Sequence, residues 1–241
     1  MLNIILFGAP GCGKGTQAAR LAEHYDLYHI STGEVIRSEI KRGTELGKSM
    51  EGYISRGELA PDSIVVEMVR DYMRSHNDKG CIFDGFPRTT AQAEIFDTLL
   101  AEIDSKVDAM IYMDVPEEEL VKRILLRGKD SGRADDASED VIRNRIEVYN
   151  AQTAVVADFY RAQGKFESVP SMGTIEEVAE RIGAVVEKYL RYNMSTKASC
   201  FSTTPTDIDV ANGSSKTLSP EEKAHFDSMF PSLDSLMQFM N

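Results

Sequence analysis

The sequence has few cysteines and no long hydrophobic run. Its three cysteines, Cys12, Cys81 and Cys200, lie far apart and are odd in number, so they provide neither a disulfide framework nor a four-cysteine metal site. The run over residues 2–7, apolar apart from Asn3, is too short for a signal peptide, and no run approaches the roughly 18 residues of a membrane span. We therefore expect a cytoplasmic protein without a membrane partner.

Positively charged residues are also in the minority. The chain has 27 Lys and Arg against 39 Asp and Glu, which gives a formal net charge of -12. A surface with this balance does not attract nucleic acid or anionic membranes by bulk charge. Any site for an anion must therefore be a local concentration of Lys and Arg.

Short apolar runs of the kind found in β-strands recur along the 241 residues, with helix-length segments between them. They occupy residues 3–7, 28–30, 81–83, 110–114 and 166–169. This alternation is typical of repeated βαβ units, which form a parallel sheet with helices on both faces. The sequence therefore predicts an α/β protein with a five-stranded parallel sheet. Ligands of such sheets bind at the carboxyl ends of the strands.

Two segments interrupt the alternation. The stretch between the second and third runs is too long for one crossover, and it carries helical patterns punctuated by glycines, which predicts a helical insert over residues 32–73. The polar segment 127–138 breaks two helical patterns and predicts a short exposed loop.

The composition changes after Tyr192. Ser, Thr, Asn and Gly dominate residues 193–217, which therefore bury too little apolar surface to fold and are predicted to form a flexible linker after a domain over residues 1–192. Residues 218–241 begin with the helix-start signals Ser219 and Pro220 and continue with apolar side chains at helical spacing. This amphipathic segment either folds back on the protein or docks on a protein partner.

The stretch GAPGCGKGT at residues 8–16 lies between a strand pattern and a helical pattern, the context of a phosphate-binding loop. Its glycines let successive N–H groups face one anion, and the following helix adds its dipole. Gly15 stands where the general pattern has a hydroxyl residue after the lysine, Lys14. Mg²⁺ must then be held by phosphates, water and an acid elsewhere. Asp84 is the candidate acid, with a simple turn cap as its alternative role.

Four ordered motifs, GAPGCGKGTQ, HISTGEVIR, FDGFPRTTAQAE and RGKDSGRADD, resemble those of the nucleoside monophosphate kinases, most closely the adenylate kinases with a short lid. The resemblance runs from residue 1 to about residue 189. It implies a three-layer P-loop fold in which 32–73 is the insert that binds the nucleoside monophosphate and 127–138 is the lid. It also implies the reaction MgATP + AMP = 2 ADP and a role in adenine nucleotide homeostasis. In this family, glycine after the loop lysine is normal.

The resemblance assigns roles residue by residue. The ATP-binding residues of the family match Gly11, Cys12, Gly13, Lys14, Gly15, Thr16, Arg123 and Arg127. The AMP-binding residues match Thr32, Gly33, Arg37, Gly85, Arg88, Gln92, Arg133 and Arg145, with Gln92 reading the adenine edge. The expected catalytic residues are Lys14, Arg88, Arg133 and Arg145, and Asp84 matches the acid that holds Mg²⁺ through water.

The implied mechanism needs no general base, because the acceptor is already an ionised phosphate oxygen. Catalysis is expected from in-line positioning and from cations around the transferring group. The insert and the lid are expected to close and exclude water. On a helix, Arg143 and Arg145 cannot share a face, and the family pattern selects Arg145. The lid lacks a cysteine cluster, so we expect no zinc.

Two other functions fit the sequence less well. Phosphorylation of UMP or CMP is disfavoured because Thr32 and Gln92 resemble the adenine-reading pattern, where pyrimidine enzymes tend to have Ala and Asn. A nucleotide-binding protein without catalysis would lack the loop lysine or the cleft arginines, and none of them is missing. We therefore expect an adenylate kinase that acts as a monomer on ATP and AMP, with ADP as its product.

Overall fold

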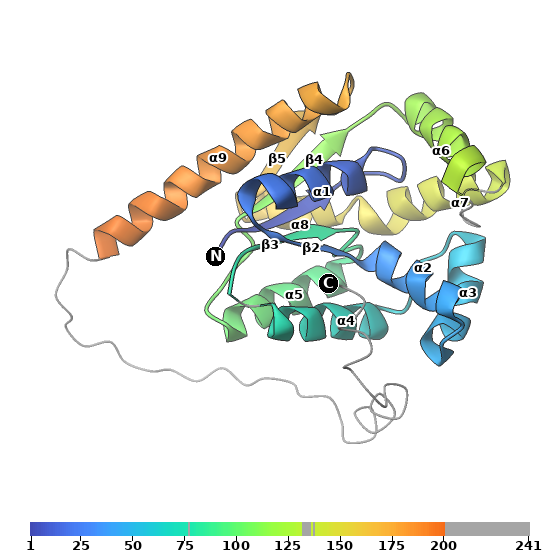
Figure 1. Ribbon diagram of the computed structural model, residues 1–241, viewed down its shortest axis with the longest axis horizontal. Coiled ribbons are helices and arrows are strands. Elements are labelled where there is room, and N and C mark those ends of the chain that lie inside the picture. The colour runs from blue at the N-terminus through green and yellow to red at the C-terminus, as the bar shows by residue number, and fades with distance from the viewer. Residues whose placement is uncertain (77, 132–135, 137, 201–241) are drawn as a thin grey trace.

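The computed structural model describes residues 1–76, 78–131, 136 and 138–200, and it describes side chains for 1–76, 78–129, 136 and 138–191. A five-stranded parallel sheet lies at the centre, in the order β2-β3-β1-β4-β5 (Figure 1). The strands are β1 (Asn3–Phe7), β2 (Tyr28–Ser31), β3 (Cys81–Asp84), β4 (Ala109–Asp114) and β5 (Phe166–Pro170). The predicted α/β fold with this sheet is confirmed.

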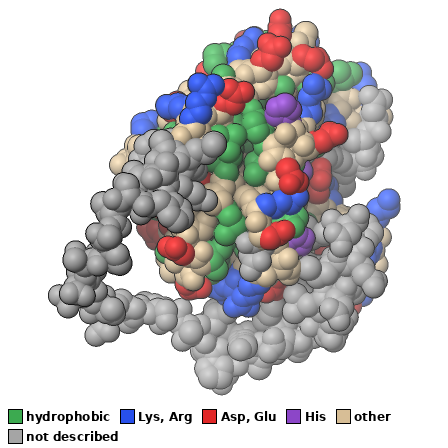
Figure 2. Space-filling view, turned by 60° about the vertical axis from the view of Figure 1, so that its left-hand side comes forward, with side chains coloured by type: hydrophobic (Ala, Val, Ile, Leu, Met, Phe, Trp, Pro, Cys, Tyr) green, Lys and Arg blue, Asp and Glu red, His purple; other side chains and the backbone are tan. Residues whose placement is uncertain are grey.

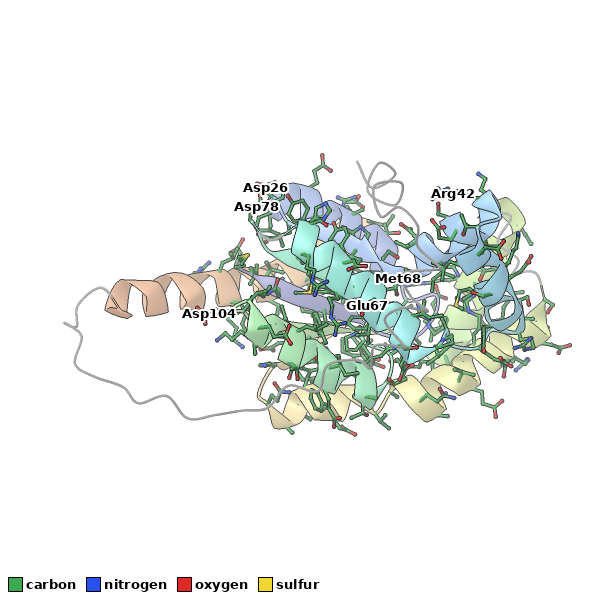
Figure 3. All side chains as sticks on the ribbon, turned by 90° about the horizontal axis from the view of Figure 1, so that it is seen from below. Asp26, Arg42, Glu67, Met68, Asp78 and Asp104 are labelled. Carbon is green, nitrogen blue, oxygen red and sulfur yellow. The ribbon has the colours of Figure 1, made fainter. Side chains whose placement is uncertain are left out.

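Helices cover both faces of the sheet. Contacts place α1 (Lys14–Tyr25) and α9 (Ile175–Cys200) against one face, and α5 (Thr90–Glu102) and α8 (Val156–Ala162) pack on the other (Figure 1). Three helices, α2 (Thr32–Arg42), α3 (Glu45–Arg56) and α4 (Asp62–Ser75), fill the chain between β2 and β3, where the sequence predicts the insert. Seen from below, α4 lies beside α5, with Glu67 and Met68 marking α4 (Figure 3).

The core sits around the central strands. All five residues of β1 are buried, and its neighbour β3 is buried throughout, as expected for parallel strands covered on both faces. Phe96 of α5 is fully buried against Phe83 and Phe86, with ring centroids 4.7 and 5.1 Å away. This packing anchors the segment that follows β3.

Acidic and basic side chains are interspersed on the face drawn in Figure 2, without a large patch of either sign. Exposed side chains of opposite charge also pair with each other, as Arg20 does with Glu176 and Lys48 with Glu45. Among the helices of the described part of the chain, none combines the length and apolarity needed to span a membrane.

The C-terminal helix and the lid region differ from the sequence expectations. Helix α9 continues to Cys200, past residue 192, where the linker was expected to begin. Neither Gly nor Pro occurs between residues 193 and 200, so nothing there stops a helix outright. Helix α6 (Glu117–Ser131) likewise enters the predicted lid, and α7 (Glu139–Val148) begins directly after it. Residues 132–135, 137 and 201–241, with Arg133 and the amphipathic segment, lie outside the described residues.

Candidate active site

The loop between β1 and α1 curls around its own lysine. Gly11 has φ 88° and Gly13 has φ 100°, a left-handed region that side chains disfavour, and a Cβ on Gly11 would lie 2.7 Å from Ile124 Cγ1. Lys14 Nζ donates to the carbonyl oxygens of Gly8 at 2.7 Å and Ala9 at 3.1 Å. The ammonium group and the N-terminus of α1 therefore face the same space, which is favourable for a phosphate.

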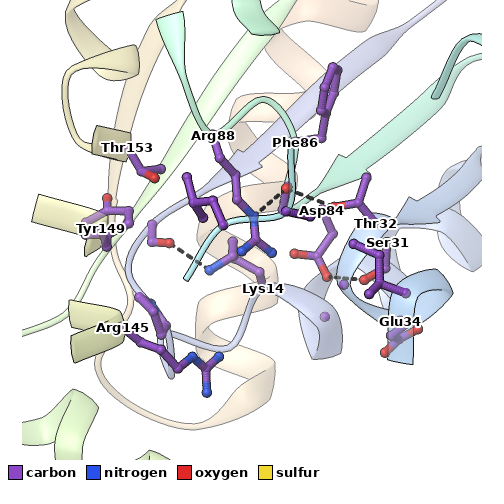
Figure 4. Close-up of a pocket in the computed structure, with 18 of the residues that line it drawn as sticks. Lys14, Ser31, Thr32, Glu34, Asp84, Phe86, Arg88, Arg145, Tyr149 and Thr153 are labelled. Atoms are coloured by element: carbon purple, nitrogen blue, oxygen red, sulfur yellow. Dashed lines mark hydrogen bonds between the residues drawn. The ribbon is translucent and has the colours of Figure 1, made fainter. Parts of the chain in front are cut away.

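This loop borders a cleft of about 310 Å³ at the carboxyl ends of the strands (Figure 4). The other walls come from α2, from the segment joining α3 to α4, from the β3–α5 segment, and from α6 and α7. Most of the residues predicted for the site line it: Gly11, Gly13, Lys14, Gly15, Thr16, Thr32, Gly33, Arg37, Asp84, Gly85, Arg88, Gln92, Arg127 and Arg145.

Two predicted residues that the structure describes do not line this cleft. Cys12 is 2% exposed, and its Sγ lies 3.6 Å from Lys14 Nζ, so its side chain packs beneath the loop. Arg123 is held outside the cleft: its Nε donates to Glu119 at 2.9 Å and its Nη1 to the carbonyl oxygen of Ser171 at 3.4 Å. Arg123 therefore faces the segment between β5 and α9.

Asp84 ends β3 and faces the glycine that replaces the loop hydroxyl. A Cβ on Gly15 would lie 3.4 Å from Asp84 Oδ2, and Ser31 Oγ donates to the same oxygen at 3.3 Å. Burial by itself would raise the pKa of Asp84, but the His29 ring and the charges of Lys14 and Arg88 outweigh it and lower the pKa. The carboxylate thus stays ionised beside the loop.

Arg88 of the GFPR segment lies close to Arg37 of α2. Gly85 has φ 77°, and Arg88 Nε donates to its carbonyl oxygen at 2.7 Å. A Cβ on Gly33 would lie 3.1 Å from Arg37 Nη1 and 3.5 Å from Arg88 Nη2, so both guanidinium groups converge on this glycine. In Figure 4, Arg88 extends toward Lys14 and Asp84. The cleft therefore concentrates positive charge, although the net charge of the whole chain is negative.

A buried carboxylate joins the two arginines on the other side of the cleft. Arg127 donates two bonds to Asp136, at 2.7 and 2.9 Å, and Arg145 Nη1 donates a third at 2.5 Å. The Asp136 side chain is 0% exposed. Burial acts to raise its pKa, yet the bonds and charges of the two arginines prevail and lower it. Arg143, by contrast, is exposed and pairs with Glu139, so Arg145 alone of the two points inward.

Several residues that line the cleft belong to none of the four sequence motifs. Gly57, Glu58, Leu59 and Ala60 line it between α3 and α4. Tyr149 and Thr153 line it from η2 (Tyr149–Thr153), a π-helical turn that continues α7. Such turns are frequent at functional sites, but their i to i+5 bonding has no simple sequence pattern. Among these residues, only Gly57 indicates a turn from the sequence alone, and in the structure it ends α3 with φ 73°.

Within the described residues, no group of three or more His, Cys, Asp and Glu side chains lies close enough to form a metal site.

Comparisons with known proteins agree with this geometry. The family model described as Adenylate kinase matches residues 6–165. An adenylate kinase from Phocaeicola vulgatus is 50% identical over 189 residues, which cover 78% of this chain and 100% of the relative. Those of Porphyromonas gingivalis and Flavobacterium psychrophilum are 50% and 46% identical and are covered over 97% and 98% of their lengths. The chain therefore belongs to the adenylate kinase family, whose members are phosphotransferases acting on nucleoside monophosphates.

Proposed function

We propose that the chain catalyses reversible transfer of the γ-phosphoryl group of MgATP to AMP, which yields two ADP. The observation that carries this proposal is the single cleft onto which Lys14, Arg37, Arg88, Arg127 and Arg145 all open. Two nucleotides bring a large negative charge into one space, and the protein as a whole is acidic. Only a local gathering of cations of this kind stabilises that arrangement.

The two sides of the cleft divide the substrates between them. We assign ATP to the phosphate loop, with Lys14 and Thr16 at the start of α1, and to Arg127 on α6, all of which line the cleft. We assign AMP to Thr32, Gly33 and Arg37 on α2, with Arg88 and Gln92 beyond β3, which line the same cleft. Arg145 stands beside Arg127, where the transferring phosphoryl group would pass between the two halves.

Mg²⁺ fits the acidic side of this site. Asp84 is an ionised carboxylate facing Gly15, and it is the residue that would hold the ion through water. When bound, Mg²⁺ neutralises phosphate charge. Asp84 itself is kept in place by Ser31, whose hydroxyl donates to it. Where other phosphate loops have a hydroxyl side chain, this chain has Gly15, and the space in front of it is bordered by the Asp84 carboxylate.

The chemistry requires positioning rather than proton removal. The phosphate of AMP already carries ionised oxygens, so the attacking atom needs no base. Asp84 is a poor proton acceptor, because the His29 ring and the charges of Lys14 and Arg88 lower its pKa. Lys14, Arg88 and Arg145 supply the charge that stabilises the transition state, and Arg133 joins them in this proposal from the lid. An arginine so placed contributes roughly 10³ to 10⁵ in rate.

Exclusion of water falls to the elements on either side of the cleft. Helices α2 to α4 flank it on the AMP side, and α6 and α7 flank it on the ATP side through Arg127 and Arg145. We propose that both close over the bound nucleotides, because an open cleft would let water accept the phosphoryl group. Residues of one chain supply these walls, and we propose a monomer as the working form. We also propose that it acts in the cytoplasm.

An acceptor profile tests the proposal. Formation of ADP is measured by a coupled assay with MgATP and, in turn, AMP, UMP, CMP and GMP. We expect AMP to have the highest kcat/KM by a wide margin. A clear preference for UMP or CMP would replace the assignment by a pyrimidine one. No turnover with any acceptor would show that the chain binds nucleotides without catalysing transfer.

A further inference from the structure

The first residue of α4 is bonded to the start of α5. Asp62 Oδ2 accepts a bond from Thr89 Oγ1 at 2.8 Å, and its Oδ1 accepts one from Gln92 Nε2 at 2.7 Å. Thr89 is also the N-cap of α5, where its Oγ1 accepts from the backbone N–H of Gln92 at 3.1 Å. Both oxygens of Asp62 are therefore engaged by the turn that carries Gln92.

These bonds fix the orientation of the Gln92 side-chain amide. Its Oε1 accepts from the backbone N–H of Arg88 at 2.7 Å, while its Nε2 donates to Asp62. A backbone N–H can only donate and a carboxylate can only accept, so the assignment of oxygen and nitrogen is forced. Rotating the amide by half a turn would place two acceptors together at Asp62 and two donors together at Arg88. Gln92 is 1% exposed, so water has little access to relieve either mismatch.

The locked amide still has hydrogen-bonding capacity for a ligand of the cleft that Gln92 lines. One N–H of Nε2 and one lone pair of Oε1 remain after the bonds to Asp62 and Arg88. The Watson–Crick edge of adenine offers an acceptor at N1 and a donor at the 6-amino group, which an amide in one fixed orientation complements. Hypoxanthine and guanine present the reverse, a donor at N1 and an acceptor at position 6, and would need the rotated amide.

We propose that Asp62 is a positioning residue that sets acceptor specificity: its carboxylate holds the Gln92 amide in the orientation that pairs with a 6-aminopurine and opposes a 6-oxopurine. This inference rests on the proposed function, with AMP as acceptor. Asp62 itself needs no contact with the nucleotide. Its influence passes through a single neighbouring side chain.

IMP is the probe, because it differs from AMP only at this edge of the base. In Asp62→Asn, the new side-chain amide can donate or accept, so it removes one of the two mismatches of the rotated Gln92 amide and leaves only the one at the backbone N–H of Arg88. The measured quantities are KM for AMP and the inhibition constant of IMP competing with AMP, which is obtained even if IMP is not phosphorylated. We expect the selectivity ratio of the two constants to fall about tenfold, the size of one buried hydrogen-bond mismatch.

Two further variants make the test specific. Asp62→Ser removes the obligate acceptor in another way and should lower the ratio in the same direction, and it serves if Asp62→Asn does not fold. Glu51→Gln makes the same change of charge at an exposed position of α3 and should leave the ratio unchanged. Folding of each variant is checked by urea unfolding.

The outcomes separate the two proposals. If wild type phosphorylates AMP but the folded Asp62 variants keep the wild-type selectivity ratio, the specificity role is wrong and the proposed function stands. Equal weakening of AMP and IMP would also overturn it, since that is the signature of a residue that merely supports α4. If wild type does not phosphorylate AMP at all, the proposed function itself fails.

Discussion

Replacing Asp136 by Asn tests whether a buried carboxylate holds two cleft arginines in place. The substitution keeps the shape of the side chain and removes its charge. The native carboxylate accepts three bonds from Arg127 and Arg145, and its side chain is 0% exposed. In the variant, one of the two acceptor oxygens becomes an NH₂ group that faces guanidinium donors. At least one bond is lost, and the others lose the assistance of the negative charge.

The size of the effect follows from these contacts. A hydrogen bond to a charged group contributes about 1.5–3 kcal/mol. The Arg127 side chain is 34% exposed, so water replaces part of what it loses, whereas that of Arg145 is only 16% exposed. We therefore expect the unfolding free energy to fall by about 2–3 kcal/mol, which for a chain of this size lowers Tm by roughly 5–10 °C. The KM for ATP should rise, because Arg127 and Arg145 lose their common partner.

The pH dependence gives a second readout. The pKa of Asp136 is lower in the folded than in the unfolded protein, so its contribution is fully present above the unfolded value of about 4 and is lost as pH falls through the folded value. The stability difference between wild type and Asp136→Asn should be constant from about pH 8 to 5 and shrink below about pH 4. Urea unfolding across this range measures it. Unchanged stability together with tighter ATP binding would refute the reasoning, because Asp136 would then only compete with the phosphates of ATP for Arg127 and Arg145.

Two further predictions concern the cleft wall and a core thiol. Gly57→Ala should lower stability by about 1–2 kcal/mol and reduce kcat, because φ is 73° and the new Cβ would lie 2.6 Å from Arg145 Cγ. Gly43→Ala is the control, because its φ is 67° but no atom lies within 4 Å of the new Cβ, so it should lower stability without reducing kcat. Equal kcat in the two variants would show that the contact between residue 57 and Arg145 does not matter for catalysis. Cys81 should resist iodoacetamide at pH 8, because burial raises its pKa to about 12. Peptide mass spectrometry in buffer and in urea checks this, and rapid labelling in buffer would show that β3 opens.

Much of the fold could be predicted because buried parallel strands are continuous apolar runs. The run at 3–7 matches β1, and the run at 81–83 differs from β3 only by Asp84, the polar residue that enters the cleft. The end of α9 was harder to predict. Ser and Thr after residue 192 suggested a linker, but a helix tolerates them at small cost when Gly and Pro are absent.

Residues of the site were predictable where a motif fixes them and not where tertiary contacts do. Lys14 and Arg88 belong to motifs with a strand before them, so the topology brings them to the same edge of the sheet. Asp62 and Gln92 are 30 residues apart, and their bond depends on how α4 returns beside α5. Asp136 lies in the segment 127–138 that the sequence predicts as the lid, but its bonds to both Arg127 and Arg145 depend on the angle between α6 and α7. No local spacing encodes either contact.

The central claim is that cations gathered in one cleft perform the transfer without a proton acceptor. Its most direct test is kcat for Arg88→Met at saturating MgATP and AMP, with urea unfolding to confirm that the variant is folded. The account predicts a fall of about 10³ or more, since the guanidinium group stabilises the transferring phosphoryl group. A folded variant with kcat within about tenfold of wild type would contradict it, because so small a loss is far below what a transition-state arginine contributes.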